Sequence, residues 1–165
     1  MQQIEEAVKL FHKYGIAVEG NFIIGLPGSS VKTIKNDIAF AKKIKLDSAI
    51  FGLLIPFPGM EVTDWVNANG KWLIDWRQSI PQGAKVNVLF ETENFTKDER
   101  LKMYYESNIK CNNYFAFMDE HASFKQNFFN ILKYVIRYDF KGLPRHFYWI
   151  LKNRRKVLAK LTRKS

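Results

Sequence analysis

The chain has 165 residues, of which 47% are apolar and 15% aromatic, so it can form a hydrophobic core and is not a disordered or low-complexity chain. Its net charge of +10 is uneven, because residues 141–165 contain nine basic side chains and no acidic one. The single cysteine, Cys111, excludes an intrachain disulfide, a four-cysteine zinc site and an iron–sulfur ligand set. The three histidines have no metal-ligand spacing, so we predict no metal site.

The N-terminal residues predict no signal peptide, since no basic segment is followed by an apolar stretch. No apolar run reaches the roughly 18 residues that cross a bilayer. We therefore expect a cytoplasmic protein, and attachment to a membrane surface stays open.

The first half alternates helices and strands. Apolar periodicity predicts helices over residues 2–14, from 31 to 41 and over 61–68, and strands over 16–24 and 49–55. This alternation favours parallel strands joined by crossover helices. Two parallel strands are too few for a domain, so we expect either further strands from outside this chain or pairing of the chain with itself.

The two faces of the first strand differ in polarity. Val18, Gly20, Phe22 and Ile24 share an apolar face. Ala17, Glu19, Asn21 and Ile23 lie on the other, which thus carries two polar groups. Two interpretations of Asn21 stay open: it faces a ligand, or it bonds a neighbouring strand.

Two loop phrases follow the strands. Residues 20–30 are Gly-Asn-Phe-Ile-Ile-Gly-Leu-Pro-Gly-Ser-Ser, and residues 54–61 are Leu-Ile-Pro-Phe-Pro-Gly-Met-Glu. In this order and spacing they resemble the late part of the barrel of radical S-adenosylmethionine (SAM) enzymes, especially the subgroup with a cobalamin (B12)-binding domain. The chain departs from that pattern at Ser29 and Met60, and it lacks the C-x-x-x-C-x-x-C motif of the family.

The resemblance implies an α/β fold: the last two βα units of an incomplete (β/α) barrel in residues 1–70, and a mainly α-helical C-terminal extension in residues 71–165. It implies a fragment, inactive alone, of an enzyme that cleaves SAM at a [4Fe–4S] cluster. The missing N-terminal half of the barrel would hold that cluster, and cobalamin-dependent methylation or rearrangement stays open. This chain alone would hold no cofactor.

The resemblance also implies cofactor-binding residues near the adenosyl group of SAM. Gly25 and Gly52 would let the backbone approach a ligand closely. The predicted set is Asn21, Ile23, Gly25, Leu26, Gly52, Leu54 and Pro56. The alternative that both loops are only strand–helix turns stays open, and we predict no catalytic residue.

The second half is predicted to be helical. Thr96 and Glu99 form a capping-box pattern that opens a helix reaching towards residue 117. Ser123 and Gln126 open a second helix, and a last one spans 145–161. A short strand is expected over 86–90, and three tryptophans indicate a packed cap: Trp65, Trp72 and Trp76.

The basic segment 141–165 admits three interpretations. It is a solvated helix end, an anionic-membrane contact or, less favoured, a nucleic-acid contact. The alternative function is therefore a stand-alone basic helical module that binds membrane or nucleic acid.

Overall fold

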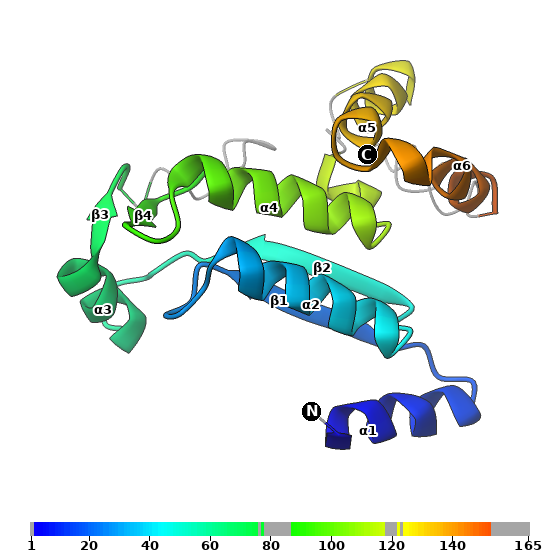
Figure 1. Ribbon diagram of the computed structural model, residues 1–165, viewed down its shortest axis with the longest axis horizontal. Helices are drawn as coiled ribbons and strands as arrows, with labels where there is room; N and C mark the ends of the chain where they lie inside the picture. The colour runs from blue at the N-terminus through cyan, green and yellow to red at the C-terminus, as the bar shows by residue number, and fades with distance from the viewer. Residues whose placement is uncertain (1, 76, 78–86, 118–121, 123, 153–165) are drawn as a thin grey trace, which may run out of the picture.

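The computed structural model describes residues 2–75, 77, 87–117, 122 and 124–152 (Figure 1). The strands are β1 (Glu19–Ile24), β2 (Ser48–Leu53), β3 (Gly70–Trp72) and β4 (Phe90–Thr92). The helices are α1 (Gln2–Lys13), α2 (Val31–Lys43), α3 (Glu61–Asn69), α4 (Lys97–Lys110), α5 (Phe124–Asp139) and α6 (Leu143–Lys152), with two short 3₁₀ turns, η2 (Tyr114–Phe117) and η3 (Phe140–Gly142).

Strands β1 and β2 are parallel and are joined by α2, as the alternation of elements predicted. Their register places Asn21 opposite Ile50 and Ile23 opposite Gly52. Helix α2 begins where Ser30 and Thr33 form a reciprocal capping box, which satisfies two backbone N–H groups that the first turn leaves without helical partners. The short strands β3 and β4 form a separate antiparallel pair.

Helices α2 and α4 cover one face of the β1–β2 sheet (Figure 1). Ile24 from β1, Phe51 from β2 and Met103 from α4 are fully buried there, together with the apolar stripe of α2. The rings of Phe22 and Phe51 stack with their centroids 4.6 Å apart. This packing confirms that the face with Phe22 and Ile24 is the one that meets helices.

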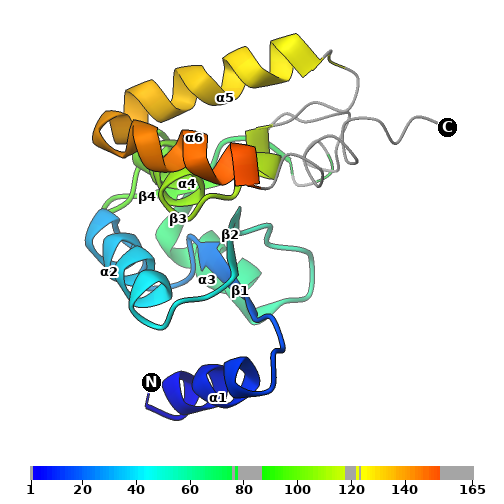
Figure 2. The same cartoon turned by 90° about the vertical axis from the view of Figure 1, so that its right-hand side faces the viewer.

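Helix α1 stands apart from the other elements in both views (Figures 1 and 2). It buries only Val8, and two polar side-chain contacts connect it to the body. Lys43 Nζ lies 2.7 Å from Glu5 Oε1, and His12 Nε2 lies 2.9 Å from Asp47 Oδ2. Such exposed pairs contribute little stability each, so α1 is held loosely compared with α2.

The C-terminal helices pack on the last turns of α4. The capping box of Thr96 and Glu99 is present and confirms the predicted start of α4. Buried apolar side chains connect α4, η2 and α5: Ile109, Tyr114, Phe117, Ile131 and Val135. Helix α6 begins at Leu143, two residues before its predicted start, with Pro144 in its first turn, where a missing N–H costs no helical hydrogen bond. Ser123, Trp76, Val86 and the predicted helix beyond residue 152 lie outside the described residues.

The described residues contain no barrel: their strands form two separate two-stranded sheets. The prediction of the last two units of a (β/α) barrel is therefore corrected to a small α/β arrangement followed by helices. The strand–turn–helix pattern specifies one crossover unit, and such a unit belongs to many parallel α/β folds. The division between residues 1–70 and 71–165 stays a prediction, although α4 packs directly on the sheet.

Candidate functional site

The uncovered face of the β1–β2 sheet is the candidate site. Asn21 and Ile23 from β1 and Gly52 from β2 lie on this face, opposite the helices. Ile23 is 47% exposed, which is unusual for a large apolar side chain in a parallel sheet, because both faces of such sheets are normally covered. A Cβ atom added at Gly52 would meet nothing within 4 Å. The face therefore has the apolar Ile23 and the open space over Gly52 towards the carboxyl ends of the strands, and the polar Glu19, Asn21 and Ser48 towards their amino ends.

The first Gly/Pro loop lies at the carboxyl end of β1. Gly25 adopts φ +110°, a conformation that L side chains rarely adopt, and its N–H donates to Ser29 Oγ at 3.3 Å. Ser29 N–H donates to Leu26 O at 2.9 Å, which closes the turn and leaves the Leu26 side chain exposed. The carboxyl ends of parallel strands are where α/β proteins usually bind ligands.

The second loop lies at the carboxyl end of β2. Pro56 is buried, whereas Phe57 and Met60 are exposed. Thr63 Oγ1 donates to Phe57 O at 2.5 Å and holds the loop onto the first turn of α3. Two loops with exposed apolar side chains thus flank the carboxyl end of the sheet.

Arg100, which the sequence did not single out, explains why position 25 is glycine. Its side chain is 2% exposed, and its guanidinium carbon lies 4.2 Å from the centre of the Phe90 ring. Its Nε donates to Phe95 O at 2.9 Å. Burial lowers the pKa of Arg100 to about 10, an effect that Glu91 opposes. A Cβ at Gly25 would collide with Arg100 Nη1, so Gly25 gives room to a buried protein side chain.

The structure divides the seven predicted site residues into two groups. Asn21, Ile23 and Gly52 share the uncovered face, and Leu26 is exposed at the end of the sheet. The other three are buried within the protein: Gly25, Leu54 and Pro56. Leu54 packs with Val66, Leu89 and Phe90 in a small core cluster beneath Trp65 and Trp72.

Two features of the described part of the chain bear on its chemistry: side-chain clusters that could hold a metal ion, and the thiol of Cys111. No cluster of His, Cys, Asp and Glu side chains there could hold a metal ion. Burial raises the pKa of Cys111 to about 11, so its thiol stays protonated at neutral pH. The uncovered face can therefore bind a ligand by apolar contact with Ile23 and by hydrogen bonds to Asn21.

Two curated proteins are similar to this chain. An uncharacterized methyltransferase of Pyrococcus horikoshii is 27% identical over 148 residues, which are 89% of this chain and 30% of that protein. The bacteriochlorophyllide d C-12(1)-methyltransferase of Chlorobaculum tepidum is 36% identical over 59 residues, which are 36% of this chain and 13% of that protein. The chain thus spans less than a third of the length of either relative. No family model and no solved structure matches it.

These findings do not support the radical SAM assignment, and what replaces it is a similarity to two proteins named as methyltransferases. Both relatives are named as methyltransferases, and neither name states a radical mechanism, an iron–sulfur cluster or cobalamin. Gly-Leu-Pro-Gly and Pro-Phe-Pro-Gly are sequences that favour turns in proteins of any function. They therefore predict the geometry of a loop more reliably than the reaction of an enzyme. The predicted use of SAM is compatible with the names of both relatives. Neither the relatives nor the structure supports the predicted [4Fe–4S] cluster or cobalamin.

The alternative of a stand-alone basic module that binds membrane or nucleic acid is not supported either. The similarity to a methyltransferase extends over most of the chain, and residues 153–165 of the basic segment lie outside the described residues. Among the helices that the structure describes, none is long and apolar enough to cross a membrane.

Proposed function

We propose that this chain is part of an enzyme that transfers a methyl group from SAM. The observation that carries the proposal is the similarity of 89% of the chain to a methyltransferase. The end of the uncovered sheet face supports it, because the exposed apolar Ile23 and the open space over Gly52, near the carboxyl ends of parallel strands, suit the ring of a nucleoside.

The adenosyl group of SAM is proposed to lie on the face formed by Asn21, Ile23 and Gly52. The open space over Gly52 admits a flat ring, and Ile23 offers an apolar contact for it. The Asn21 amide can donate and accept hydrogen bonds at the polar edge of an adenine. SAM itself supplies the reactive methyl group, while these side chains bind and orient the donor and keep water from one of its sides.

Further residues of the same protein are proposed to cover this face and to pair with the free edge of β1. Asn108 of α4 already occupies the outer edge of β2, so β1 is the strand at which the parallel sheet can grow. Both relatives are much longer than the segment that matches this chain, so in them the remaining residues are long enough to provide such strands.

The test is SAM binding by the protein as its gene encodes it, measured by isothermal titration calorimetry. Gly52→Val fills the open space and is expected to weaken binding roughly tenfold or more, because a branched side chain would stand where the ring lies. Ala39→Val, on the exposed side of α2, is the matched control and is expected to leave binding unchanged. Equal affinity of Gly52→Val and the control would place the donor elsewhere.

A further inference from the structure

A cavity of about 260 Å³ lies at the amino end of β2, far along the sheet from the Gly/Pro loops. Its lining comes from the turn after α2, the last turn of α4 and the start of α6. Ala41, Leu46 and Ala49 give it an apolar wall. Four cationic side chains also line it: Lys42, Lys45, Lys110 and Arg145.

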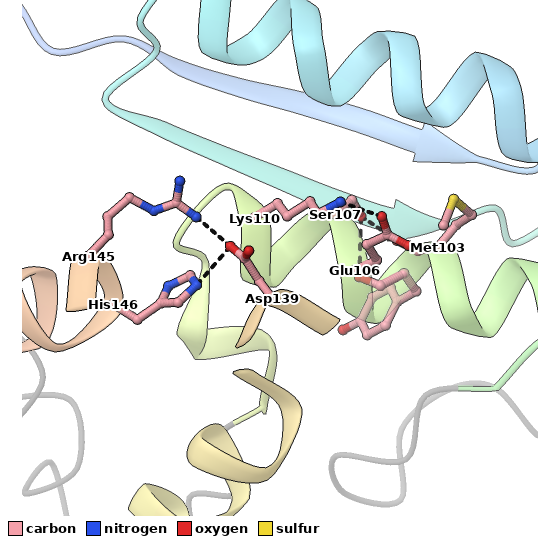
Figure 3. Close-up of polar contacts among 8 residues, drawn as sticks. Met103, Glu106, Ser107, Lys110, Asp139, Arg145 and His146 are labelled. Atoms are coloured by element: carbon pink, nitrogen blue, oxygen red, sulfur yellow. Dashed lines mark hydrogen bonds and ion pairs between the residues drawn. The ribbon is translucent and has the colours of Figure 1, made fainter. Parts of the chain in front are cut away.

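Two of the four cations already have carboxylate partners. Lys110 Nζ lies 2.6 Å from Glu106 Oε1, and Arg145 Nη2 lies 2.5 Å from Asp139 Oδ2 (Figure 3). The figure shows Lys110 and Arg145 each directed at its own acid. Lys42 and Lys45 make no ion pair with any described residue, so the cavity carries an excess of two positive charges.

Lys42 is disfavoured as a cation by its surroundings in the cavity. The pKa of Lys42 is lowered by its partial burial and, next, by the charge of Arg145, and Lys110 lowers it further. Cys111 and Asp139 oppose this effect. A cation that burial and two other cations disfavour is stabilised when an anion enters between them.

Helix dipoles explain the positions of only two of these four cations. Lys42 and Lys110 lie in the last turns of α2 and α4, where cations favourably face the free carbonyl groups. Lys45 lies beyond the end of α2, in a left-handed turn at φ 58°. Arg145 comes from α6, about a hundred residues further along the chain. Their convergence on one cavity is therefore a property of the tertiary fold.

We propose that this cavity binds a small phosphate-bearing anion, either inorganic phosphate or the phosphate group of a small metabolite. A tetrahedral dianion matches the charge of Lys42 and Lys45 and can accept hydrogen bonds from both ammonium groups. The apolar wall would contact the carbon skeleton of a phosphate monoester. The site lies at the opposite end of the sheet from the proposed SAM surface and does not depend on it.

Cys111 provides a direct test, because it is the chain's single cysteine and lines the same cavity. The rate of its alkylation by iodoacetamide, a neutral reagent, is measured with inorganic phosphate and with chloride at equal ionic strength. Occupancy of the cavity is expected to slow alkylation severalfold in a saturable way. Glycerol 3-phosphate in a parallel arm separates the sources: stronger protection than by inorganic phosphate indicates a monoester.

The matched variants are Lys42→Gln with Lys45→Gln, and, as control, Lys32→Gln with Lys35→Gln on the same helix but away from the cavity. The first pair is expected to weaken the protection by phosphate roughly tenfold, and the control pair to preserve it. All four lysines reach solvent, Lys42 while also partly buried, so glutamine in their place should leave the fold intact. Absence of protection in the wild type, or equal protection in both variants, would overturn the proposal.

Discussion

The side-chain amide of Asn108 in α4 forms hydrogen bonds with both the backbone N–H and the backbone C=O of Phe51 in β2. Phe51 N–H donates to Asn108 Oδ1 at 3.1 Å, and Asn108 Nδ2 donates to Phe51 O at 2.9 Å. Asn108 Oδ1 also accepts from Asn113, and Nδ2 also donates to Tyr104 O. The buried amide thus imitates a neighbouring strand at one residue and closes the outer edge of β2.

Asn108→Ala is expected to destabilise the fold by about 2–4 kcal/mol, since it leaves the buried N–H and C=O of Phe51 without partners. Urea unfolding followed by circular dichroism measures this change. Asn36→Ala, an exposed asparagine on α2, serves as the control and should cost close to nothing. A loss equal to that of the control would show that the edge of β2 does not depend on Asn108.

Gly25 and Gly28 make a matched pair for the Arg100 contact. Both have positive φ, but only at Gly25 would a Cβ meet Arg100, while at Gly28 it meets nothing within 4 Å. Gly28→Ala should cost about 1–2 kcal/mol from backbone strain alone, and Gly25→Ala clearly more. In an Arg100→Met background the extra cost of Gly25→Ala should shrink, because the collision is relieved. Thermal unfolding of the four variants tests this, and an unchanged extra cost would contradict the assigned clash.

His146 predicts a pH dependence of stability. It is buried against Asp139, and its Nδ1 contacts the Tyr114 hydroxyl. Burial lowers its pKa, and Arg145 and Lys42 act in the same direction, while Asp139 opposes them. The unfolded chain therefore binds a proton more readily than the folded one just below the ordinary histidine pKa, so acidification destabilises the fold.

Urea unfolding between about pH 8 and about pH 5.5 should show stability that is constant at the upper end and falls as the pH passes below about 6.5. His146→Gln is expected to remove much of that slope, whatever its own effect on stability. The carboxylates with lowered pKa, Glu5, Asp47 and Glu99, lose their contribution only at more acidic pH. A slope that survives unchanged in His146→Gln would refute the assignment.

The elements with strong local signals were predictable from the sequence. Apolar periodicity predicted α1, α2 and the two parallel strands, and the pattern of Thr96 and Glu99 predicted the start of α4. Strand β3 was missed because three residues paired with distant β4 carry no periodicity of their own.

The tertiary contacts were not predictable in this way. Arg100 and Asn108 look like ordinary helix-surface residues in the sequence, yet the fold buries both. The loop phrases predicted where the turns lie, but the chemistry inferred from them was wrong in its finer part, since turn sequences constrain backbone geometry. Within the site, strand alternation grouped Asn21 with Ile23, and only the register added Gly52.

The most direct test of the central claim is ultraviolet cross-linking of radiolabelled SAM to the protein as its gene encodes it, followed by mass-spectrometric mapping of the labelled peptides. The account predicts that the label lies in peptides that contain residues 19–26 or 48–57 and that excess unlabelled SAM removes it. Displaceable label confined to other peptides, or no displaceable label at all, would contradict the proposed SAM surface.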